Sequence, residues 1–141
     1  TFKPIDQEDL SNLKLNKEWV SVSRKVVEEI KRIKQTDRRI IAIGTTSVRA
    51  LESCYSHEIN NFIPIAKYVD LVIKPGYKFK VVDGLLTNFH LPKSSLLLLV
   101  SAMIGRQRLL DLYKKAIKEK FRFFSYGDAM YISPESFLEK K

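Results

Sequence analysis

The feature that most constrains the fold is a short apolar run, residues 39–43 (RIIAI), followed at once by residues 44–52 (GTTSVRALE). A strand that is apolar along its whole length is typical of a parallel strand covered on both faces. The glycine then permits a tight turn, and hydroxyl residues gather where a helix begins. The pattern predicts a buried, parallel strand that leads directly into a helix, as in α/β proteins.

The rest of the chain alternates strand and helix patterns in the same way. The predicted strands are residues 18–22, 68–73, 77–82, 85–89 and 129–132, with a break at Asp83-Gly84 and an irregular connection over residues 56–67. The predicted helices follow the cap residue Ser23, begin at Val48, span residues 96–104 up to Gly105, and cover residues 109–117. Helices that alternate with strands indicate a single mixed α/β domain.

Composition excludes several classes of protein. Hydrophobic residues make up 45% of the 141 residues and charged residues 29%, which is typical of a globular domain. The longest apolar run, residues 96–104, is shorter than the roughly 20 residues that cross a bilayer, so no membrane partner is expected. Cys54 is the only cysteine, so there is no intramolecular disulfide and no zinc-ligand pattern. We expect no metal site and a reducing, cytoplasmic location.

The chain is strongly basic. It carries 25 Lys and Arg against 16 Asp and Glu, a net charge of +9. Such a charge attracts phosphate backbones without regard to sequence. Charge alone leaves two alternatives open, nucleic-acid binding and simple solubility.

Polar residues are unusually frequent in residues 75–95. The polar side chains among the strand-forming residues there are Asp83, Thr87, Asn88, His90, Lys93 and Ser94. A buried polar group without a partner costs about 1–3 kcal/mol, so a cluster of this kind predicts a site. Four of them also have a structural alternative: a hairpin turn at Asp83-Gly84, a core histidine at His90, a solvated side chain at Lys93 and a helix cap at Ser94.

A second candidate is the turn that starts the helix after residue 43. Gly44, Thr45, Thr46 and Ser47 would place hydroxyls and free amides where an anion or carboxylate binds well. Arg49 could add a bidentate contact to the same anion. The alternative is ordinary capping, with Arg49 on a solvated face. The segment lacks both the Walker lysine and the Gly-x-Gly-x-x-Gly pattern.

A third candidate lies at residues 121–128 (FRFFSYGD), where aromatic residues surround Arg122. Such a segment can stack bases and bind phosphate, or its phenylalanines can pack in the core. Arg122, Tyr126 and Asp128 are the functional candidates. The preceding helix carries a lysine-rich face over residues 114–120, which is either solvated or a secondary contact to phosphates.

Four segments in a fixed order resemble a known family. They are residues 44–52 (GTTSVRALE), 75–79 (PGYKF), 82–94 (VDGLLTNFHLPKS) and 126–130 (YGDAM). Together they resemble the S-adenosylmethionine:tRNA ribosyltransferase-isomerases of queuosine biosynthesis, over about residues 1–132. The resemblance implies that residues 1–141 are the C-terminal portion of a larger, barrel-like α/β domain. The N-terminal part of the same enzyme and a small inserted β domain would then be absent. Leu13 and Asn16 stand where the family usually has histidines, and Glu18 is kept.

The resemblance also implies a reaction. The ribosyl portion of S-adenosylmethionine would move to 7-aminomethyl-7-deazaguanine in tRNA, giving epoxyqueuosine and releasing adenine and methionine. The partners would be tRNA and S-adenosylmethionine as a co-substrate, with no tightly bound cofactor. Such chemistry needs a base at the 5′ carbon, an acid at adenine and a binding site for the methionine carboxylate.

The hypothesis assigns the candidates as follows. The catalytic acid or base would be Asp83, His90 or Asp128. Substrate would be bound by Gly44, Thr45, Thr46, Ser47, Arg49, Thr87, Asn88 and Tyr126, and tRNA by Lys78, Lys93 and Arg122. The isolated chain is expected to be inactive. The alternatives are a non-catalytic tRNA- or nucleotide-binding module and, less favoured because no glycine-rich loop is present, a methyltransferase.

Overall fold

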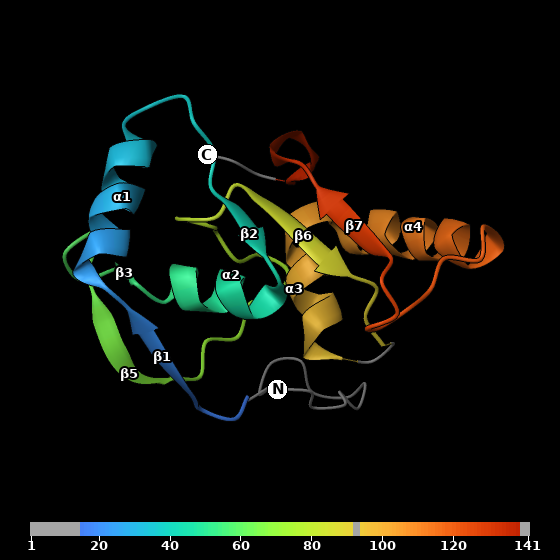
Figure 1. Cartoon of the computed structure of the whole chain (residues 1–141), viewed down its shortest axis with the longest axis horizontal. Coiled ribbons are helices and arrows are strands. Elements are labelled where there is room, and N and C mark those ends of the chain that lie inside the picture. The colour runs from blue at the N-terminus through green and yellow to red at the C-terminus, as the bar shows by residue number, and fades with distance from the viewer. Residues whose placement is uncertain (1–14, 92–93, 139–141) are drawn as a thin grey trace.

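The computed structural model describes residues 15–91 and 94–138 and has a mixed α/β fold (Figure 1). The strands are β1 (Glu18–Val22), β2 (Ile41–Ile43), β3 (Tyr55–Ser56), β4 (Asn61–Phe62), β5 (Ile65–Val69), β6 (Gly84–Asn88) and β7 (Ala129–Ile132). The helices are α1 (Arg24–Lys34), α2 (Thr45–Glu52), α3 (Ser95–Ile104) and α4 (Arg106–Lys118), followed by a 3-10 turn at Pro134–Ser136.

A three-stranded sheet in the order β2-β6-β7 forms the centre of the fold (Figure 1). β2 and β6 are parallel, and β7 is antiparallel to β6. α2 packs against β2 and β6, and α3 packs against α4. The predicted parallel strand that leads directly into a helix is therefore confirmed, as is the α/β class.

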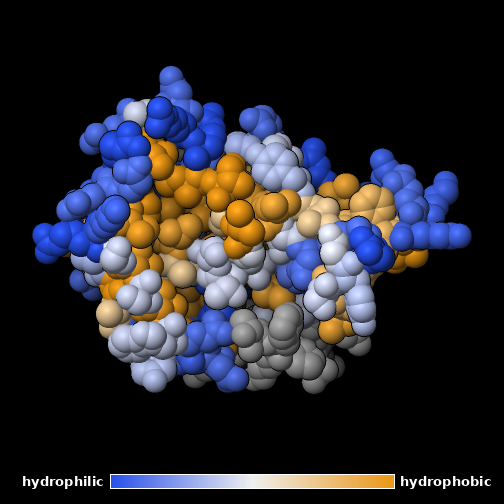
Figure 2. All heavy atoms as spheres, viewed as in Figure 1, coloured by the Kyte–Doolittle hydropathy of each residue, from blue (hydrophilic) through white to orange (hydrophobic). Residues whose placement is uncertain are grey.

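The two faces of this sheet differ. Ala42, Leu85 and Ile132 lie on the buried face, each at most 3% exposed. On the other face, Ile43 is 72% exposed and Tyr131 is 58% exposed. Figure 2 shows hydrophobic atoms gathered over β2 and β6 on this face. The prediction that β2 is covered on both faces is thus wrong for the residues described here, because none of them covers Ile43.

The ends of the helices agree with their predicted signals. The Ser23 Oγ accepts a hydrogen bond from the Val26 amide at 3.4 Å and caps α1. Gly105 ends α3 with a φ of 84°, a left-handed conformation that costs glycine little. Leu99, Val100 and Met103 of α3 are buried in the main hydrophobic cluster. Burial of side chains of this size contributes roughly 1.5–3 kcal/mol each.

Several predicted strands were wrong. Residues 56–67, predicted to be irregular, contain the end of β3, all of β4 and the start of β5, and β5 ends at Val69, before the predicted residue 73. Residues 77–82 form no strand. The physical reason is the buried carboxylate of Glu52, which accepts hydrogen bonds from the amides of Lys80, Val81 and Val82. These amides have a side chain as partner, so they do not pair with a neighbouring strand.

The Asp83-Gly84 pair does not form a hairpin turn. Gly84 instead begins β6, opposite Ile41 of the parallel strand β2. A Cβ atom at Gly84 would lie 2.6 Å from the Cδ1 of Ile41 and 3.0 Å from the backbone oxygen of Ile132. A side chain at this position would displace the end of Ile41 and press on the backbone of β7, so the close approach of both neighbouring strands favours glycine.

Candidate functional site

The carboxyl ends of β2 and β6 meet at one edge of the sheet, which is where ligands bind in open α/β sheets. A pocket of about 230 Å³ lies there. We call it the β2–β6 pocket, and it is lined by Gly44, Thr45, Thr46, Thr87, Asn88, His90 and Leu96. Six of these residues come from two segments that are far apart in the sequence and that the sequence identified as candidates.

Gly44 sets the geometry on the β2 side of the pocket. Its φ of 83° is in the left-handed region, and its amide donates to the backbone oxygen of Leu86 at 2.9 Å. The chain thereby turns from β2 into α2 next to the end of β6. The first amides of a helix have no partner within the helix, and the helix dipole favours negative charge there. Thr46 is exposed beside them, while Thr45 is buried.

Ser47 and Arg49 do not line this pocket. The Ser47 hydroxyl donates to the backbone oxygen of Ile43 at 2.7 Å. Arg49 is only 6% exposed, so the solvated alternative is wrong. Its Nη1 donates to Glu18 at 2.7 Å and its Nε to the backbone oxygen of Leu71 at 3.2 Å. In this structure Arg49 connects α2 to β1.

Thr87 and His90 form the opposite side of the pocket. The Thr87 Oγ1 and the His90 Nε2 are 2.9 Å apart, and the His90 amide donates to the Tyr113 hydroxyl at 2.8 Å. Burial lowers the pKa of His90 to about 4. The imidazole is therefore neutral at pH 7, able to donate or accept a hydrogen bond but without a charge.

Asn88 connects the pocket to residues 121–128, which we call the aromatic loop. Its Nδ2 donates to the backbone oxygen of Phe124 at 2.8 Å, and the Phe124 amide donates to the Phe89 oxygen at 2.9 Å. The aromatic loop therefore borders the pocket without lining it.

Two sequence candidates in the aromatic loop bind each other. The Asp128 carboxylate accepts from the Arg122 Nε at 3.2 Å and from Nη2 at 3.0 Å. These hydrogen bonds lower the pKa of Asp128. Tyr126, between them, is 70% exposed. Asp128 is thus ionised and paired, a state that suits positioning of Arg122 better than proton transfer.

Asp83 lies away from the pocket. One carboxylate oxygen accepts from the Ile40 amide at 2.8 Å, and the other pairs with the Lys34 Nζ at 3.1 Å. Asp83 directly precedes β6, and Asn88 ends it, so about 16 Å of strand separates them. These contacts are structural, and a catalytic role for Asp83 stays a prediction.

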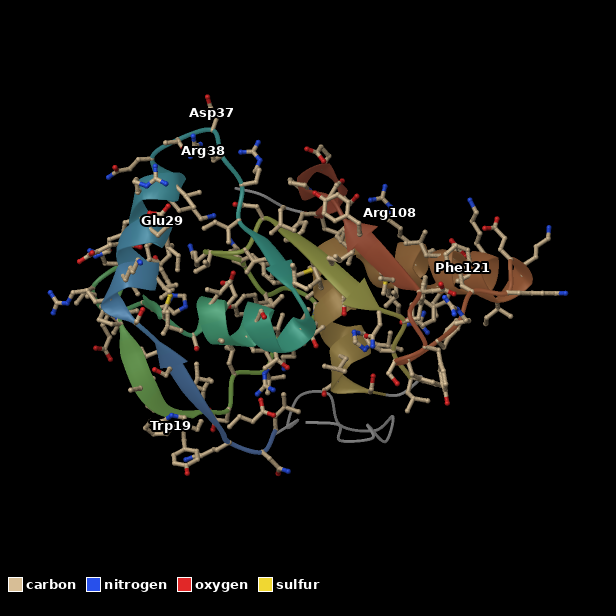
Figure 3. All side chains as sticks on the ribbon, viewed as in Figure 1. Trp19, Glu29, Asp37, Arg38, Arg108 and Phe121 are labelled. Carbon is tan, nitrogen blue, oxygen red and sulfur yellow. The ribbon has the colours of Figure 1, made fainter. Side chains whose placement is uncertain are left out.

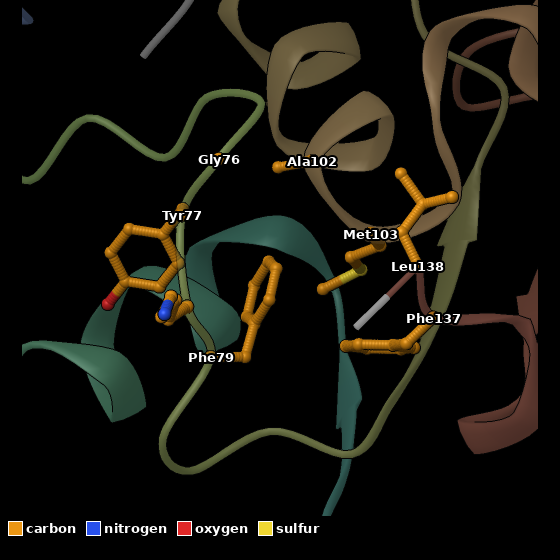
Figure 4. Close-up of a pocket in the computed structure, with 8 residues that line it drawn as sticks. Gly76, Tyr77, Phe79, Ala102, Met103, Phe137 and Leu138 are labelled. Atoms are coloured by element: carbon orange, nitrogen blue, oxygen red, sulfur yellow. The ribbon is translucent and has the colours of Figure 1, made fainter. Parts of the chain in front are cut away.

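Lys78 lines a different pocket. This pocket measures about 290 Å³ and is bounded mainly by apolar side chains, among them Phe79, Met103 and Phe137 (Figure 4). Leu96, in the β2–β6 pocket, lies two turns before Met103 along α3, roughly 10 Å away. The β2–β6 pocket gathers hydroxyl, amide and imidazole side chains at the end of a parallel strand pair, whereas most side chains of the larger pocket are apolar, so we place the candidate site at the β2–β6 pocket.

Four further positions were singled out in the sequence. Lys93, predicted to bind tRNA, and Leu13 lie outside the described residues. Asn16 is exposed and precedes β1. Glu18, two residues later, binds Arg49.

Sequence reasoning missed the role of Glu52. Its side chain is 2% exposed and accepts hydrogen bonds from three backbone amides and from the Tyr77 hydroxyl at 3.2 Å. Burial raises its pKa. The signal that could have predicted this burial is its spacing, four residues after the buried Val48 on the same helix face.

Within residues 15–91 and 94–138, no three His, Cys, Asp or Glu side chains lie close enough to hold a metal ion. In the same part of the chain, no helix is both long enough and apolar enough to cross a membrane.

Comparisons with known proteins agree on one family. The family described as "Queuosine biosynthesis protein" matches residues 1–132. The chain is 92% identical, over its whole length, to the S-adenosylmethionine:tRNA ribosyltransferase-isomerase of Prochlorococcus marinus strain MIT 9301. It is 59% identical over 98% of its length to the protein of that name from strain NATL2A of the same species. It spans about 38% of the length of each of these two relatives.

A solved structure is also similar. It is the crystal structure of S-adenosylmethionine tRNA ribosyltransferase from Thermotoga maritima, with a TM-score of 0.73 and 41% sequence identity. The similarity covers 79% of this chain and 39% of that one. The mixed α/β arrangement described above is therefore shared with a solved protein of related sequence.

Proposed function

This chain belongs to the queuosine biosynthesis protein family, and on that premise we propose that it is part of an S-adenosylmethionine:tRNA ribosyltransferase-isomerase. The observation that carries the proposal is the 92% identity to curated proteins of that name. The β2–β6 pocket supports it, because it collects polar groups at the edge of the sheet where ligands bind. A tRNA-modifying role would place the protein in the cytoplasm.

The proposed reaction transfers the ribosyl portion of S-adenosylmethionine to the amino nitrogen of 7-aminomethyl-7-deazaguanine in tRNA. The product is epoxyqueuosine, and adenine and methionine leave. The sulfonium acidifies the neighbouring 5′ carbon, so a base must accept a proton there. Adenine leaves more readily when a donor meets its ring. No tightly bound cofactor is proposed, since S-adenosylmethionine is consumed as a co-substrate.

We assign the α2 side of the pocket to an anionic or hydroxyl group of the co-substrate. The free amides of the first helical turn and the exposed hydroxyl of Thr46 suit the methionine carboxylate or a ribose hydroxyl. The pocket volume of about 230 Å³ is below the roughly 300–1,000 Å³ of typical ligand pockets. The pocket would therefore bind part of the co-substrate, and other parts of the longer protein would bind the rest.

We assign the β6 side to hydrogen bonding with the sugar or a base. The Asn88 carbonyl oxygen can accept from a ligand while its Nδ2 holds Phe124. The neutral imidazole of His90 can accept a proton, and Thr87 fixes its orientation. Tyr126 and Arg122, on the neighbouring aromatic loop, are assigned to the tRNA. Lys78 and Lys93 remain proposed tRNA contacts outside this pocket, and Ser47 and Arg49 would act only after rearrangement.

The open sheet face supports the proposal that this chain is one part of a larger domain. Parallel strands are normally covered on both faces, yet Ile43 and Leu86 are exposed. We propose that another part of the enzyme covers this face and completes a barrel-like domain. Residues 1–141 would then be the C-terminal portion of that domain.

The direct test measures adenine release by the full-length protein from S-adenosylmethionine and precursor tRNA. A positioned acid or base contributes roughly 10²–10⁴-fold in rate, so His90→Ala should lower kcat at least a hundredfold. His57→Ala, at an exposed position, is the matched control and should retain turnover. Wild-type protein that forms S-adenosylhomocysteine, or releases no adenine, would overturn the proposed reaction.

A second candidate function is a non-catalytic tRNA- or nucleotide-binding module. The observation that favours it is the net charge of +9, which attracts phosphate backbones whether or not any chemistry follows. It predicts that the isolated 141-residue chain binds tRNA in a salt-sensitive manner and releases no adenine.

A further inference from the structure

Positive charge is concentrated on α4 and the aromatic loop. Residues 106–128 contain seven basic and three acidic residues, a net charge of +4 out of the chain's +9. The side chains of Lys114 and Lys115 are 75% and 69% exposed, and that of Arg122 is 65% exposed. Figure 3 shows basic side chains extending from this end of the molecule, near the labelled Phe121.

The acidic neighbours do not neutralise this surface. The Lys114 Nζ lies 3.5 Å from the Asp111 Oδ1, and the Lys115 Nζ lies 3.9 Å from the Glu119 Oε1. Exposed ion pairs of this kind are weak and are screened by salt. Lys118 forms no ion pair within the described part of the chain. The surface therefore remains attractive to a polyanion.

Backbone strain is concentrated where α4 ends. The Phe121 amide donates to the Ala116 oxygen at 2.9 Å, and the Lys120 amide donates to the Ile117 oxygen at 3.1 Å. This helix end usually places glycine in the left-handed position, but here Lys120 occupies it with a φ of 60°. Phe124 is also left-handed, with a φ of 64°. Strained residues of this type cluster at functional sites.

Exposed aromatic side chains lie beside these cations. Tyr126 is 70% exposed, Phe121 is 41% exposed and Phe124 is 38% exposed. Aromatic rings next to basic residues are the usual way in which proteins stack unpaired bases and bind the adjoining phosphates. Membrane surfaces also accept basic and aromatic side chains, but the hydrogen bond from Asn88 to the Phe124 oxygen joins this loop to the β2–β6 pocket, which favours an RNA base as the occupant.

This surface is continuous with the β2–β6 pocket. Asn88 lines the pocket and donates to Phe124 of the aromatic loop. Asp128 holds Arg122 through two side-chain hydrogen bonds, which fixes the guanidinium on the same loop. An RNA bound along α4 would therefore bring an unpaired base next to the pocket.

We propose that α4 and the aromatic loop form one binding surface for a structured RNA with an unpaired loop. Lys114, Lys118 and Lys120 contact phosphates of the stem, Arg122 contacts a phosphate near the loop, and Tyr126 stacks on an unpaired base. Asp128 is a positioning residue for Arg122. The choice of RNA rests on the proposed function, whereas the position of the surface rests on the charge, strain and aromatic exposure described above.

The first test measures binding of the full-length protein to a synthetic stem-loop RNA with an unpaired loop over a series of salt concentrations. Each lost phosphate contact lowers the slope of log K against log salt by about 0.7–0.9. Lys114→Gln/Lys118→Gln should therefore lower the slope by about 1.4–1.8 and weaken binding about tenfold at moderate salt. The matched control is Arg24→Gln/Lys25→Gln on α1, at the opposite end of the molecule (Figure 1). It removes the same charge and should leave the slope unchanged.

A second variant separates binding from folding. Lys120→Gly places glycine at a left-handed position, so the variant should be at least as resistant to urea as the wild type. It should nevertheless bind the stem-loop several-fold more weakly, because a phosphate contact is lost. Unchanged affinity in a folded Lys120→Gly protein would overturn the role of Lys120.

The remaining outcomes are equally decisive. Equal losses in the α4 and α1 variants would show general electrostatic attraction and overturn the proposal. If Lys114→Gln/Lys118→Gln loses binding to vesicles of acidic phospholipid but still binds the stem-loop RNA as the wild type does, the surface is a membrane-binding one and the proposal is overturned. If the wild type binds the stem-loop through α4 but releases no adenine, the inference stands and the proposed reaction fails.

Discussion

The two ends of β6 use polar residues in opposite ways. At the amino end, Asp83 accepts from the Ile40 amide and pairs with Lys34, so its carboxylate is occupied within the protein. At the carboxyl end, Asn88 and Thr46 line the β2–β6 pocket, which lies at the start of α2, where the first helical amides have no partner within the helix. One dense block of polar residues in the sequence is therefore divided between a structural role and a candidate binding role.

The two ends of β6 differ in how many of their polar groups already have a hydrogen-bond partner within the protein. Glu52, close in space to the amino end through its bonds to Val81 and Val82, accepts four hydrogen bonds and is almost completely buried. A carboxylate in that state has little capacity left for a substrate. The pocket end keeps capacity, because helix-terminal amides and an amide side chain need partners that a ligand can supply.

The largest effect that can test this comparison is expected from Glu52→Ala. The change leaves two buried backbone amides, of Val81 and Val82, and the partly buried amide of Lys80 without an acceptor, at about 1–3 kcal/mol each, so unfolding should become easier by roughly 3–5 kcal/mol. Asn88→Ala, at the pocket end, removes one hydrogen bond and should cost only about 1 kcal/mol. Urea denaturation of both variants measures the contrast. Similar losses of unfolding free energy in the two variants would contradict the view that polar groups are structural at the amino end of β6 and available to a ligand at its carboxyl end.

The next effect concerns His90 and pH. Its folded-state pKa of about 4 lies below the ordinary value of 6.5, because burial disfavours the charged imidazole. The unfolded chain therefore binds more protons between these two values, and stability falls as pH decreases from 6.5 towards 4, by up to about 3 kcal/mol. Denaturation midpoints against pH for wild type and His90→Gln measure this contribution.

The variant should lose that part of the pH dependence. His57→Gln, at an exposed site, should keep it. A wild-type profile matched by His90→Gln would contradict a buried, neutral imidazole in the pocket.

A smaller effect is expected from Asp83→Asn at the amino end. The amide oxygen can still accept from Ile40, but the ion pair with the partly exposed Lys34 is lost. We expect a loss of roughly 2 kcal/mol in unfolding free energy. Lys34→Gln should show a comparable loss, and a double variant should lose less than the sum. Strict additivity would show that the two side chains do not interact.

The smallest effect is expected from Gly44→Ala. No heavy atom lies within 4 Å of the position that a Cβ would take, so the substitution causes no clash. Its backbone conformation, with φ 83° and ψ 147°, is one that glycine adopts readily and alanine does not, so the substitution should cost at least about 1 kcal/mol of stability. Because the strain acts on the turn that borders the pocket, the Michaelis constant for S-adenosylmethionine should rise while the fold is kept. An unchanged Michaelis constant for S-adenosylmethionine would indicate that the co-substrate does not bind beside the Gly44 turn.

The sequence predicted the elements that depend on local signals. Ser23 and Gly105 mark helix ends through hydrogen bonding and backbone conformation that their own residue types dictate. The parallel strand at β2 followed from an unbroken apolar run. Gly44 and Asn88 were singled out separately, one for a turn that starts a helix and the other for a dense run of polar residues, and the structure brings them together in one pocket.

The rest depended on contacts between distant segments. Residues 77–82 have strand composition, yet their amides bind Glu52, which lies 28 to 30 residues earlier in the chain. Asp83 and His90 look equivalent in the sequence, and only the partners Lys34 and Tyr113 separate their roles. Arg49 is similar, because its burial follows from pairing with Glu18 on β1.

The most direct test of the central claim compares adenine release by Asn88→Ala and Asp83→Asn in the full-length protein, with tRNA saturating and S-adenosylmethionine varied. Our account predicts that Asn88→Ala lowers kcat/KM at least tenfold with little change in stability. It predicts that Asp83→Asn loses stability but keeps kcat within a few-fold of the wild type when assayed well below its melting temperature. A collapse of kcat in a folded Asp83→Asn protein, with normal turnover by Asn88→Ala, would place the active end of β6 at its beginning and contradict the account.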